Sequence, residues 1–331
     1  MNRTVLLLSI FLLATPISGW VNLAEAQQAG KVYRIGWLGS RSARPTTEIA
    51  FRQGLRELGY VEGQNVVIKY RYAGFAKRPL GELAEKLAVE LVRLKVDVIV
   101  TSGAPPVIRA AQRAIRTIPI VMVGADVDPV EAGFVVSLAR PGGNITGLAS
   151  LLAKLHPKRL ELLKEAFPRI SRVAILWNRS QFKEQVVKEA EAVGEALGIQ
   201  IRSLLARHDI ESVFSAISRE RPDGLLVVTS ASTIRHRARI AEFAIKKRLP
   251  TIHDQRRFVD AGGLMSYGAD RQHLFRRAAT YVDKILRGTK PADLPVEQPT
   301  KFDLVINLKT AKQLGITIPP NVLYQATKVI K

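Results

Sequence analysis

Cysteine is absent from the sequence, aromatic residues are few, and no apolar run reaches the length of a membrane span. Without cysteine the chain forms no disulfide and carries no lipid-modified cysteine as an anchor. The apolar run at residues 5–14 and every later one fall short of the roughly 20 residues that a membrane-spanning helix needs. Stability must therefore come from burial of hydrophobic side chains.

Motifs of catalysis and of cofactor binding are also missing. The chain has no G-x-S-x-G nucleophile elbow, no Walker loop and no G-x-G-x-x-G dinucleotide loop. The glycine-rich segment 142–147 has the wrong spacing for such a loop and predicts a turn or a hinge. The histidines, at positions 156, 208, 236, 253 and 273, lack the spacing of metal ligands. We therefore expect no enzyme activity, no cofactor and no metal.

The charge balance is strongly basic, since 50 Lys and Arg residues against 29 Asp and Glu residues give a formal charge of +21. Such a balance is often typical of nucleic-acid binding. Here the basic residues are spread over most of the expected helices, with few aromatic residues between them. We therefore interpret them as solvated helix faces and expect no nucleic-acid partner, while attraction to anionic lipid or acidic ligands stays open.

The first 26 residues have the order of a secretory signal. Arg3 precedes the apolar run, and the small-residue tripeptide Ala24-Glu25-Ala26 follows it. We predict that residues 1–26 are a signal peptide, cleaved near Ala26 and Gln27, and that the mature protein is periplasmic. The mature chain of about 305 residues exceeds what one hydrophobic core usually organises, so we expect two domains.

Two stretches of the chain present the same order of elements. In the first, apolar strands are expected at residues 33–38, 65–70, 97–100 and 120–123. In the second they are expected at residues 173–176, 200–204, 224–228 and 251–253. Amphipathic helices separate the strands, as the spacing of Phe51, Leu55 and Leu58 indicates. Strands that alternate with helices predict an α/β fold of two similar Rossmann-like lobes with parallel sheets.

The end of the chain adds elements to both lobes. Asp270 is expected to cap a helix, and the proline-rich segment 290–299 predicts an extended connector before a strand at 303–307, a short helix and a polar tail. We expect a multi-crossing hinge, with crossings near Gly142 to Gly147, Tyr267 and Pro299. The predicted division is an N-terminal lobe of residues 31–146 plus 268–299 and a C-terminal lobe of residues 147–267 plus 300–331.

Candidate ligand contacts follow from the strand map, because ligands of open parallel sheets bind outside the carboxyl ends of the strands. The residues at those ends, or in the aromatic positions nearest to them, are Ser40, Arg41, Thr101, Ser102, Gly103, Asp126, Trp177, Asn178, Ser230, Asp254 and Tyr267. Together they predict one polar site between the lobes.

Several of these residues have an ordinary alternative. Ser102 would hold a carboxylate at a helix N-terminus or simply cap that helix, and for Ser230 the cap is favoured. Asp126 would meet a ligand ammonium or stabilise a turn. Trp177 and Tyr267 would stack on a planar ligand, with core packing favoured for Trp177.

Six segments of the chain are similar to one known family. They lie at residues 51–60, 117–121, 128–130, 137–147, 160–164 and 295–302, with Arg140-Pro141-Gly142-Gly143-Asn144 at the centre of the fourth. Through them nearly all of the mature chain resembles the ABC-importer substrate-binding family that includes tryptophan- and tyrosine-binding members. The resemblance implies the type I periplasmic binding-protein fold.

This resemblance also implies a function. It implies a cleft that closes on a small ligand, an aromatic amino acid or a similar small acid, with Ser102 and Asp126 at its carboxylate and ammonium, although residues 125–128 depart from the family pattern. The partners would be that ligand and an ABC permease of the inner membrane, and we expect a monomer. The alternatives are a ligand-sensing receptor for a membrane signalling partner and an exported α/β enzyme.

Overall fold

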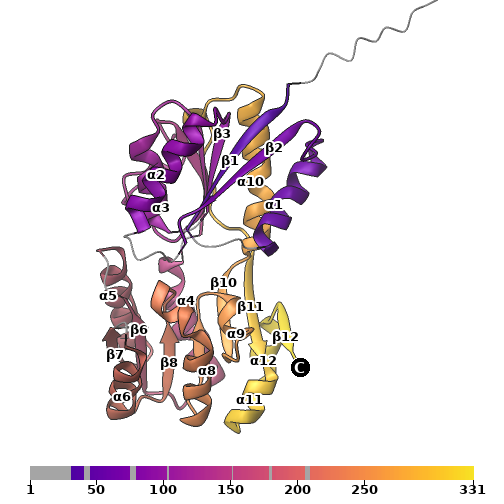
Figure 1. The fold of residues 1–331 in the computed structure, drawn as a ribbon. Helices are drawn as coiled ribbons and strands as arrows, with labels where there is room; N and C mark the ends of the chain where they lie inside the picture. The colour runs from indigo at the N-terminus through magenta and orange to yellow at the C-terminus, as the bar shows by residue number, and fades with distance from the viewer. Residues whose placement is uncertain are drawn as a thin grey trace, which may run out of the picture.

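The computed structural model describes residues 31–40, 45–74, 80–102, 104–150, 152–178, 181–205 and 209–331. The predicted signal peptide, Arg41 and Gly103 lie outside these residues. The described chain forms two α/β lobes stacked end to end, with the first lobe at the top of Figure 1. No helix in the described part of the chain combines the length and the apolar composition that crossing a membrane requires.

The first lobe contains a five-stranded sheet in the order β2-β1-β3-β4-β5, in which all neighbours are parallel. Its strands are β1 (Tyr33–Gly39), β2 (Val66–Tyr72), β3 (Val98–Ser102), β4 (Ile120–Ala125) and β5 (Ile145–Ala149). Helices α2 (Leu80–Arg93) and α3 (Pro105–Ala114) pack on one face, and α1 (Pro45–Glu57) packs with α10 (Arg271–Leu286) on the other. Figure 1 shows α10 returning to this lobe from far along the chain.

The second lobe contains a seven-stranded sheet in the order β12-β11-β10-β9-β8-β6-β7. Its strands are β6 (Arg172–Trp177), β7 (Gln200–Leu205), β8 (Gly224–Val227), β9 (Thr251–His253), β10 (Met265–Ala269), β11 (Phe302–Asn307) and β12 (Lys328–Ile330). Only the pair of β10 and β11 is antiparallel among the described pairings of this sheet.

The remaining helical elements belong to the second lobe or to the segments that connect the two lobes. They are η1 (Ala153–Leu155), α4 (His156–Ala166), α5 (Gln181–Ala196), α6 (Ile210–Glu220), α7 (Ala231–Arg235), α8 (Arg237–Lys246), α9 (Arg256–Val259), η2 (Pro291–Asp293), α11 (Leu308–Leu314) and α12 (Pro320–Gln325). Their apolar faces and the sheet enclose two further core clusters, so each sheet is buried on both sides.

The duplication predicted from the sequence is confirmed by the sheet topology. In the first sheet the order is β2-β1-β3-β4-β5, and in the second the corresponding strands follow as β7-β6-β8-β9-β10. The predicted fold class, two Rossmann-like lobes with parallel sheets, is therefore correct. The prediction of a polar tail is wrong, because residues 328–330 form β12 beside β11. A strand of three residues is too short to show a hydrophobic period.

The cap of α10 forms as predicted. The Asp270 carboxylate accepts a 3.0 Å hydrogen bond from the His273 backbone N–H. Leu274, Ala278 and Val282 on the inner face of the helix are buried in the first lobe. This cap fixes where α10 begins, and the buried face packs the helix onto the first lobe.

The described chain passes between the lobes at residues 150 and 152–155, at residues 269–271 and at residues 298–301. A 3.0 Å hydrogen bond from the Asp270 backbone N–H to the Lys301 carbonyl oxygen joins the second and third of these crossings. The hinge predicted near Gly142 to Gly147 is displaced, because residues 145–149 are still β5 of the first sheet. Gly147 serves the sheet itself, since a Cβ there would overlap the Met122 carbonyl oxygen. The exact division of residues between the lobes stays a prediction.

Candidate functional site

The crossings decide which edges of the two sheets face each other. After the carboxyl end of β5 the chain continues into the second lobe, and after the carboxyl end of β10 it continues into α10 of the first lobe. Figure 1 labels β10 and α10, which lie in different lobes. Both strands run parallel to the rest of their sheets, apart from the antiparallel β11 and its neighbour β12. The carboxyl edges of the two sheets therefore face one another, and this is where ligands of parallel sheets bind.

Four predicted contacts lie on the first of these edges. Ser40 follows β1, Thr101 and Ser102 end β3, and Asp126 follows β4. The Ser40 backbone N–H donates to the Ser102 carbonyl oxygen at 3.1 Å. The Ser150 Oγ lies 3.0 Å from the Asp126 Oδ1. The sheet thus brings these four residues together.

The structure excludes one of the two roles considered for Ser102, the helix cap. The residue that precedes α3 and acts as its N-cap is Ala104, and no side chain caps the helix. The cap alternative for Ser102 is therefore wrong, because the two prolines at the start of α3 shift the helix start away from the serine. Its role as a ligand contact stays a prediction.

The other predicted contacts gather on the second edge or beside it. Trp177 ends β6, Asn178 follows it, and Ser230 and Asp254 lie beyond β8 and β9, whereas Tyr267 is in the middle of β10. Of these, only Tyr267 lies within a strand and away from its end. Trp177, Asn178, Ser230 and Asp254 are thus placed at the carboxyl edge of one sheet, and Tyr267 lies inside that sheet.

Two of these side chains are engaged in the fold. Trp177 is 7% exposed in the core of the second lobe, and its indole Nε1 donates to the Ser203 Oγ at 2.6 Å. Ser230 is the N-cap of α7 and forms a capping box with Thr233. The alternatives favoured for both residues, core packing and helix capping, are thus observed.

Asp254 and Tyr267 are also held from within the lobe. The Asp254 carboxylate is 3% exposed and accepts a 2.9 Å hydrogen bond from the Thr229 backbone N–H and another from the Thr229 hydroxyl. These bonds join the carboxyl ends of β9 and β8. The half-buried ring of Tyr267 stacks on Phe302 with 5.8 Å between the ring centroids.

Buried polar atoms without a hydrogen-bond partner concentrate at the facing edges. Among the residues that the structure describes, seven buried side-chain nitrogen or oxygen atoms lack a partner. All but the Tyr70 Oη belong to residues at or beside the two edges, namely Thr101, Arg159, His253, Gln255 and Arg271. Buried polar groups in folded proteins are nearly always paired, so a cluster of exceptions calls for an explanation, and a binding site is one. The facing edges are therefore the candidate binding site.

Arg159 is one of two arginines that sequence reasoning missed. It lies on α4, is fully buried, and its Nη1 donates to the Leu152 carbonyl oxygen at 2.9 Å. Burial lowers the pKa of Arg159 to about 10, although the charge of Asp254 opposes this shift. The available signal was an arginine beside Leu160, Leu162 and Leu163 on a mostly apolar helix face, which also holds His156.

His253 is an uncharged group at the same edge. Burial, together with the nearby charge of Arg159, lowers the pKa of His253 to about 3. Its Nε2 lies 3.0 Å from the Thr251 Oγ1, and its ring stacks on Phe258 with 4.7 Å between centroids. The imidazole is therefore neutral at ordinary pH and is a polar, uncharged group beside the candidate site.

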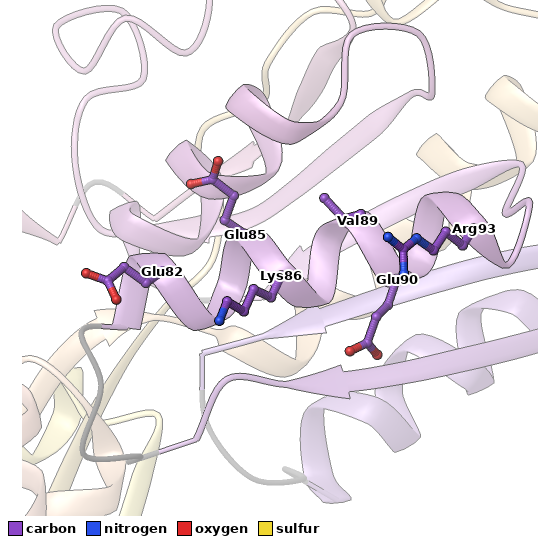
Figure 2. Close-up of a pocket in the computed structure, with 6 residues that line it drawn as sticks. All are labelled: Glu82, Glu85, Lys86, Val89, Glu90 and Arg93. Atoms are coloured by element: carbon purple, nitrogen blue, oxygen red, sulfur yellow. The ribbon is translucent and has the colours of Figure 1, made fainter.

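A surface depression also occurs outside this site, along α2 (Figure 2). It is lined by Glu82, Glu85, Lys86, Val89, Glu90 and Arg93. All of these side chains come from α2, and among the described residues no second element contributes to the lining. The depression is thus a solvated helix face. In the described part of the chain, no group of three or more His, Asp or Glu side chains is placed as metal ligands would be.

Comparison with known proteins identifies the family. Residues 40–330 match the family model described as ABC transporter substrate binding protein. The chain belongs to this family. This substrate-binding protein is also 27% identical over 282 residues to the tyrosine-binding protein of Clostridioides difficile strain R20291, an alignment that covers 80% of this chain and 75% of the relative.

Solved structures show the same similarity. A conserved domain protein from Vibrio cholerae superimposes with a TM-score of 0.79 at 29% identity, covering 90% of this chain and 100% of the other. The ABC domain in complex with L-Trp from Streptococcus pneumonia gives a TM-score of 0.78 at 26% identity, covering 90% of this chain and 99% of the other. The leucine binding protein LivK from Thermotoga maritima, at 13% identity and a TM-score of 0.53, shares the fold over 80% of this chain and 78% of the other.

Proposed function

We propose that this substrate-binding protein captures an aromatic amino acid, such as tyrosine or tryptophan, between the facing carboxyl edges of its two sheets. The observation that carries the proposal is the set of unpaired buried polar atoms on both edges. The names of two relatives, one that binds tyrosine and one solved with L-Trp, support the ligand class. The stacked rings of Tyr267 and Phe302 beside the second edge supply aromatic surface.

Capture proceeds by closure of the two lobes. A ligand that contacts both edges binds the closed arrangement more tightly than the open one, and this difference in affinity shifts the equilibrium toward closure. The crossings at residues 152–155, 269–271 and 298–301 are the hinge. On the first edge Asp126 is the carboxylate that receives the ligand ammonium.

The protein then delivers its ligand to an ABC permease of the inner membrane. In this proposal it works in the periplasm as a monomer, after removal of residues 1–26, and carries out no chemical step itself. The family match to substrate-binding proteins of ABC transporters supports the role in import. No feature of the two edges, as far as the structure describes them, favours a sensing receptor or an enzyme over this role.

The test is a ligand screen on protein purified from the periplasm of cells that express the full chain. Thermal unfolding is measured with L-tyrosine, L-tryptophan, L-leucine and L-glutamate, and each hit is titrated by calorimetry. A ligand at 100 times its Kd stabilises the folded state by about 2.7 kcal/mol. We expect such a shift with the aromatic amino acids. A shift only with L-leucine or L-glutamate would overturn the ligand class, and absence of the protein from the periplasm would overturn the location.

A further inference from the structure

Arg271 occupies a special place in the fold, because it is the first residue of α10 and follows the crossing that leaves β10. Asp270 caps the helix at this point, so the backbone of Arg271 has a fixed position between the lobes. The helix then runs along the face of the first sheet.

The guanidinium of Arg271 lies at the carboxyl end of β4. A Cβ placed on Gly124 would be 3.3 Å from the Arg271 Nη1 and 3.6 Å from its Nη2, so the guanidinium lies against the backbone of the strand. The guanidinium carbon is also 5.6 Å from the centroid of the Phe275 ring. Asp126 is two residues beyond Gly124 on this same edge. The charge of Arg271 thus belongs to the candidate site.

Two donors of this guanidinium have no partner. The Nε and Nη2 atoms of Arg271 are both buried and neither makes a hydrogen bond. These two nitrogens form one edge of the guanidinium, and their N–H bonds point in the same direction to suit a carboxylate. A buried charged donor that stays unpaired is costly, so a partner of opposite charge is strongly favoured.

Two other arginines of α10 show how the Nε and Nη2 atoms of a guanidinium bind a carboxylate. Arg277 donates from Nε to the Glu297 Oε2 at 3.0 Å and from Nη2 to the Oε1 at 2.7 Å. Arg276 donates from the same two atoms to the carboxylate of Glu57. Both are bidentate pairs with a carboxylate. Arg271 has the same two donors available and, among the described residues, forms no ion pair.

We propose that Arg271 binds the carboxylate of the captured ligand through its Nε–H and Nη2–H groups. The inference rests on the proposed function and adds to it that the ligand must carry a carboxylate or an anion of similar planar shape. Two charge-assisted hydrogen bonds from a preorganised guanidinium bind a carboxylate more strongly than the single hydroxyl of Ser102. The resemblance to the family suggested Ser102 for this role, and the geometry assigns it to Arg271.

The test combines ligand analogues with variants. Calorimetry at pH 7 compares wild-type protein titrated with L-tyrosine, with L-tyrosinamide, which lacks the negative charge, and with tyramine, which lacks the carboxylate. The variants are Arg271→Met and Arg271→Lys. The matched control is Arg276→Met, which removes an exposed arginine from the same helix.

The proposal predicts that both analogues bind at least about 30-fold more weakly than L-tyrosine to the wild type. Arg271→Met should lose affinity for L-tyrosine by at least about the same factor and bind L-tyrosine and tyramine alike. Arg271→Lys keeps the charge but cannot donate two parallel hydrogen bonds to a carboxylate, so its affinity for L-tyrosine should fall by about tenfold. Arg276→Met should bind like the wild type.

The outcomes separate this inference from the proposed function. Wild-type protein that binds L-tyrosine and L-tyrosinamide equally, or an Arg271→Met variant with unchanged affinity, would overturn the role of Arg271 while the proposed function stands. Wild-type protein that binds no amino acid of the panel would overturn both. The comparison of analogues on wild-type protein decides the matter even if Arg271→Met does not fold.

Discussion

The Nε of Arg159 donates a 2.7 Å hydrogen bond to the backbone carbonyl oxygen of Tyr267. This bond joins α4, the first helix after one crossing, to β10, the last strand before another. A second bond from the same guanidinium reaches Leu152, which lies within the first crossing. One buried side chain therefore links the first crossing to the strand that leads into the second.

Replacement of Arg159 by methionine should destabilise the protein. The carbonyl oxygens of Leu152 and Tyr267 would lose their donor inside the protein, at about 1 to 3 kcal/mol for each, while the removal of a buried charge offsets part of this cost. We expect a net loss of about 2 kcal/mol in the free energy of unfolding by urea. Arg169→Met, at an exposed position, is the control and should change it by less than about 0.5 kcal/mol. Equal stability of the two variants would refute the coupling role.

The stability of the protein should depend on pH through His253. Its pKa is lowered to about 3 in the folded protein, below the value of about 6.5 in an unfolded chain. The unfolded state therefore binds the proton first, and stability is lost as the pH falls from about 6.5 toward 3, by at most about 1.4 kcal/mol per pH unit.

The variant His253→Leu removes this contribution. Urea unfolding measured at intervals between pH 7 and pH 4 should show a shallower loss of stability than in the wild type. His273→Gln, which removes a partly exposed histidine, should retain the steep loss. A pH dependence in His253→Leu that matches the wild type would contradict the account of His253 as a buried neutral group.

Gly124 should matter for binding through its contact with Arg271. Gly124→Ala places a methyl group 3.3 Å from the guanidinium and in a backbone conformation with φ of +68°. We expect a cost of about 1 to 2 kcal/mol from the left-handed backbone and, in addition, roughly tenfold weaker ligand binding by calorimetry, because the guanidinium must shift.

Gly315→Ala is the matched control for this substitution. Gly315 has a φ of +71°, and a Cβ there meets no atom within 4 Å. It should therefore lose similar stability and bind ligand with unchanged affinity. If Gly124→Ala also leaves the affinity unchanged, the contact with Arg271 has no part in binding.

Gly147 should be required for folding of the first sheet. A methyl group at this position would overlap the backbone of Met122 in the neighbouring strand, so Gly147→Ala should lose several kcal/mol or fail to fold. Gly143→Ala, where a Cβ meets nothing within 4 Å, should be nearly neutral. A fully stable Gly147→Ala variant with altered ligand closure would instead support the hinge role expected from the sequence.

The fold could be predicted from the sequence because the signals that indicate its strands and helices are local. The buried strands β1, β3 and β4 are continuous apolar runs, and Asp270 precedes its helix in the position of a cap. The repeat of strands and helices then leaves few topologies. β12 could not be predicted in this way, because three residues are too few to show a period.

The sheet edges that frame the candidate site could be predicted from the sequence, but the buried arginines beside them could not. Strand ends indicate which loops share an edge, and Ser40, Thr101, Ser102 and Asp126 do lie on one edge. Whether an arginine is buried depends on the tertiary packing around it. Arg159 and Arg271 are two among many basic residues in the sequence, and only the fold separates them from solvated ones.

The central claim is that one ligand bridges the two facing edges. Thr101→Val on the first edge and Gln255→Met on the second each remove a buried oxygen that has no hydrogen-bond partner. Without ligand, both variants should be at least as stable as the wild type, because an unpaired buried polar group is lost.

Calorimetric titration of these two variants with L-tyrosine and L-tryptophan is the most direct measurement. Our account predicts that both variants bind the preferred amino acid several-fold more weakly than the wild type, because each edge has lost one of its contacts to the ligand. Unchanged affinity in the variant of either edge would contradict the account, since the ligand would then contact one lobe alone.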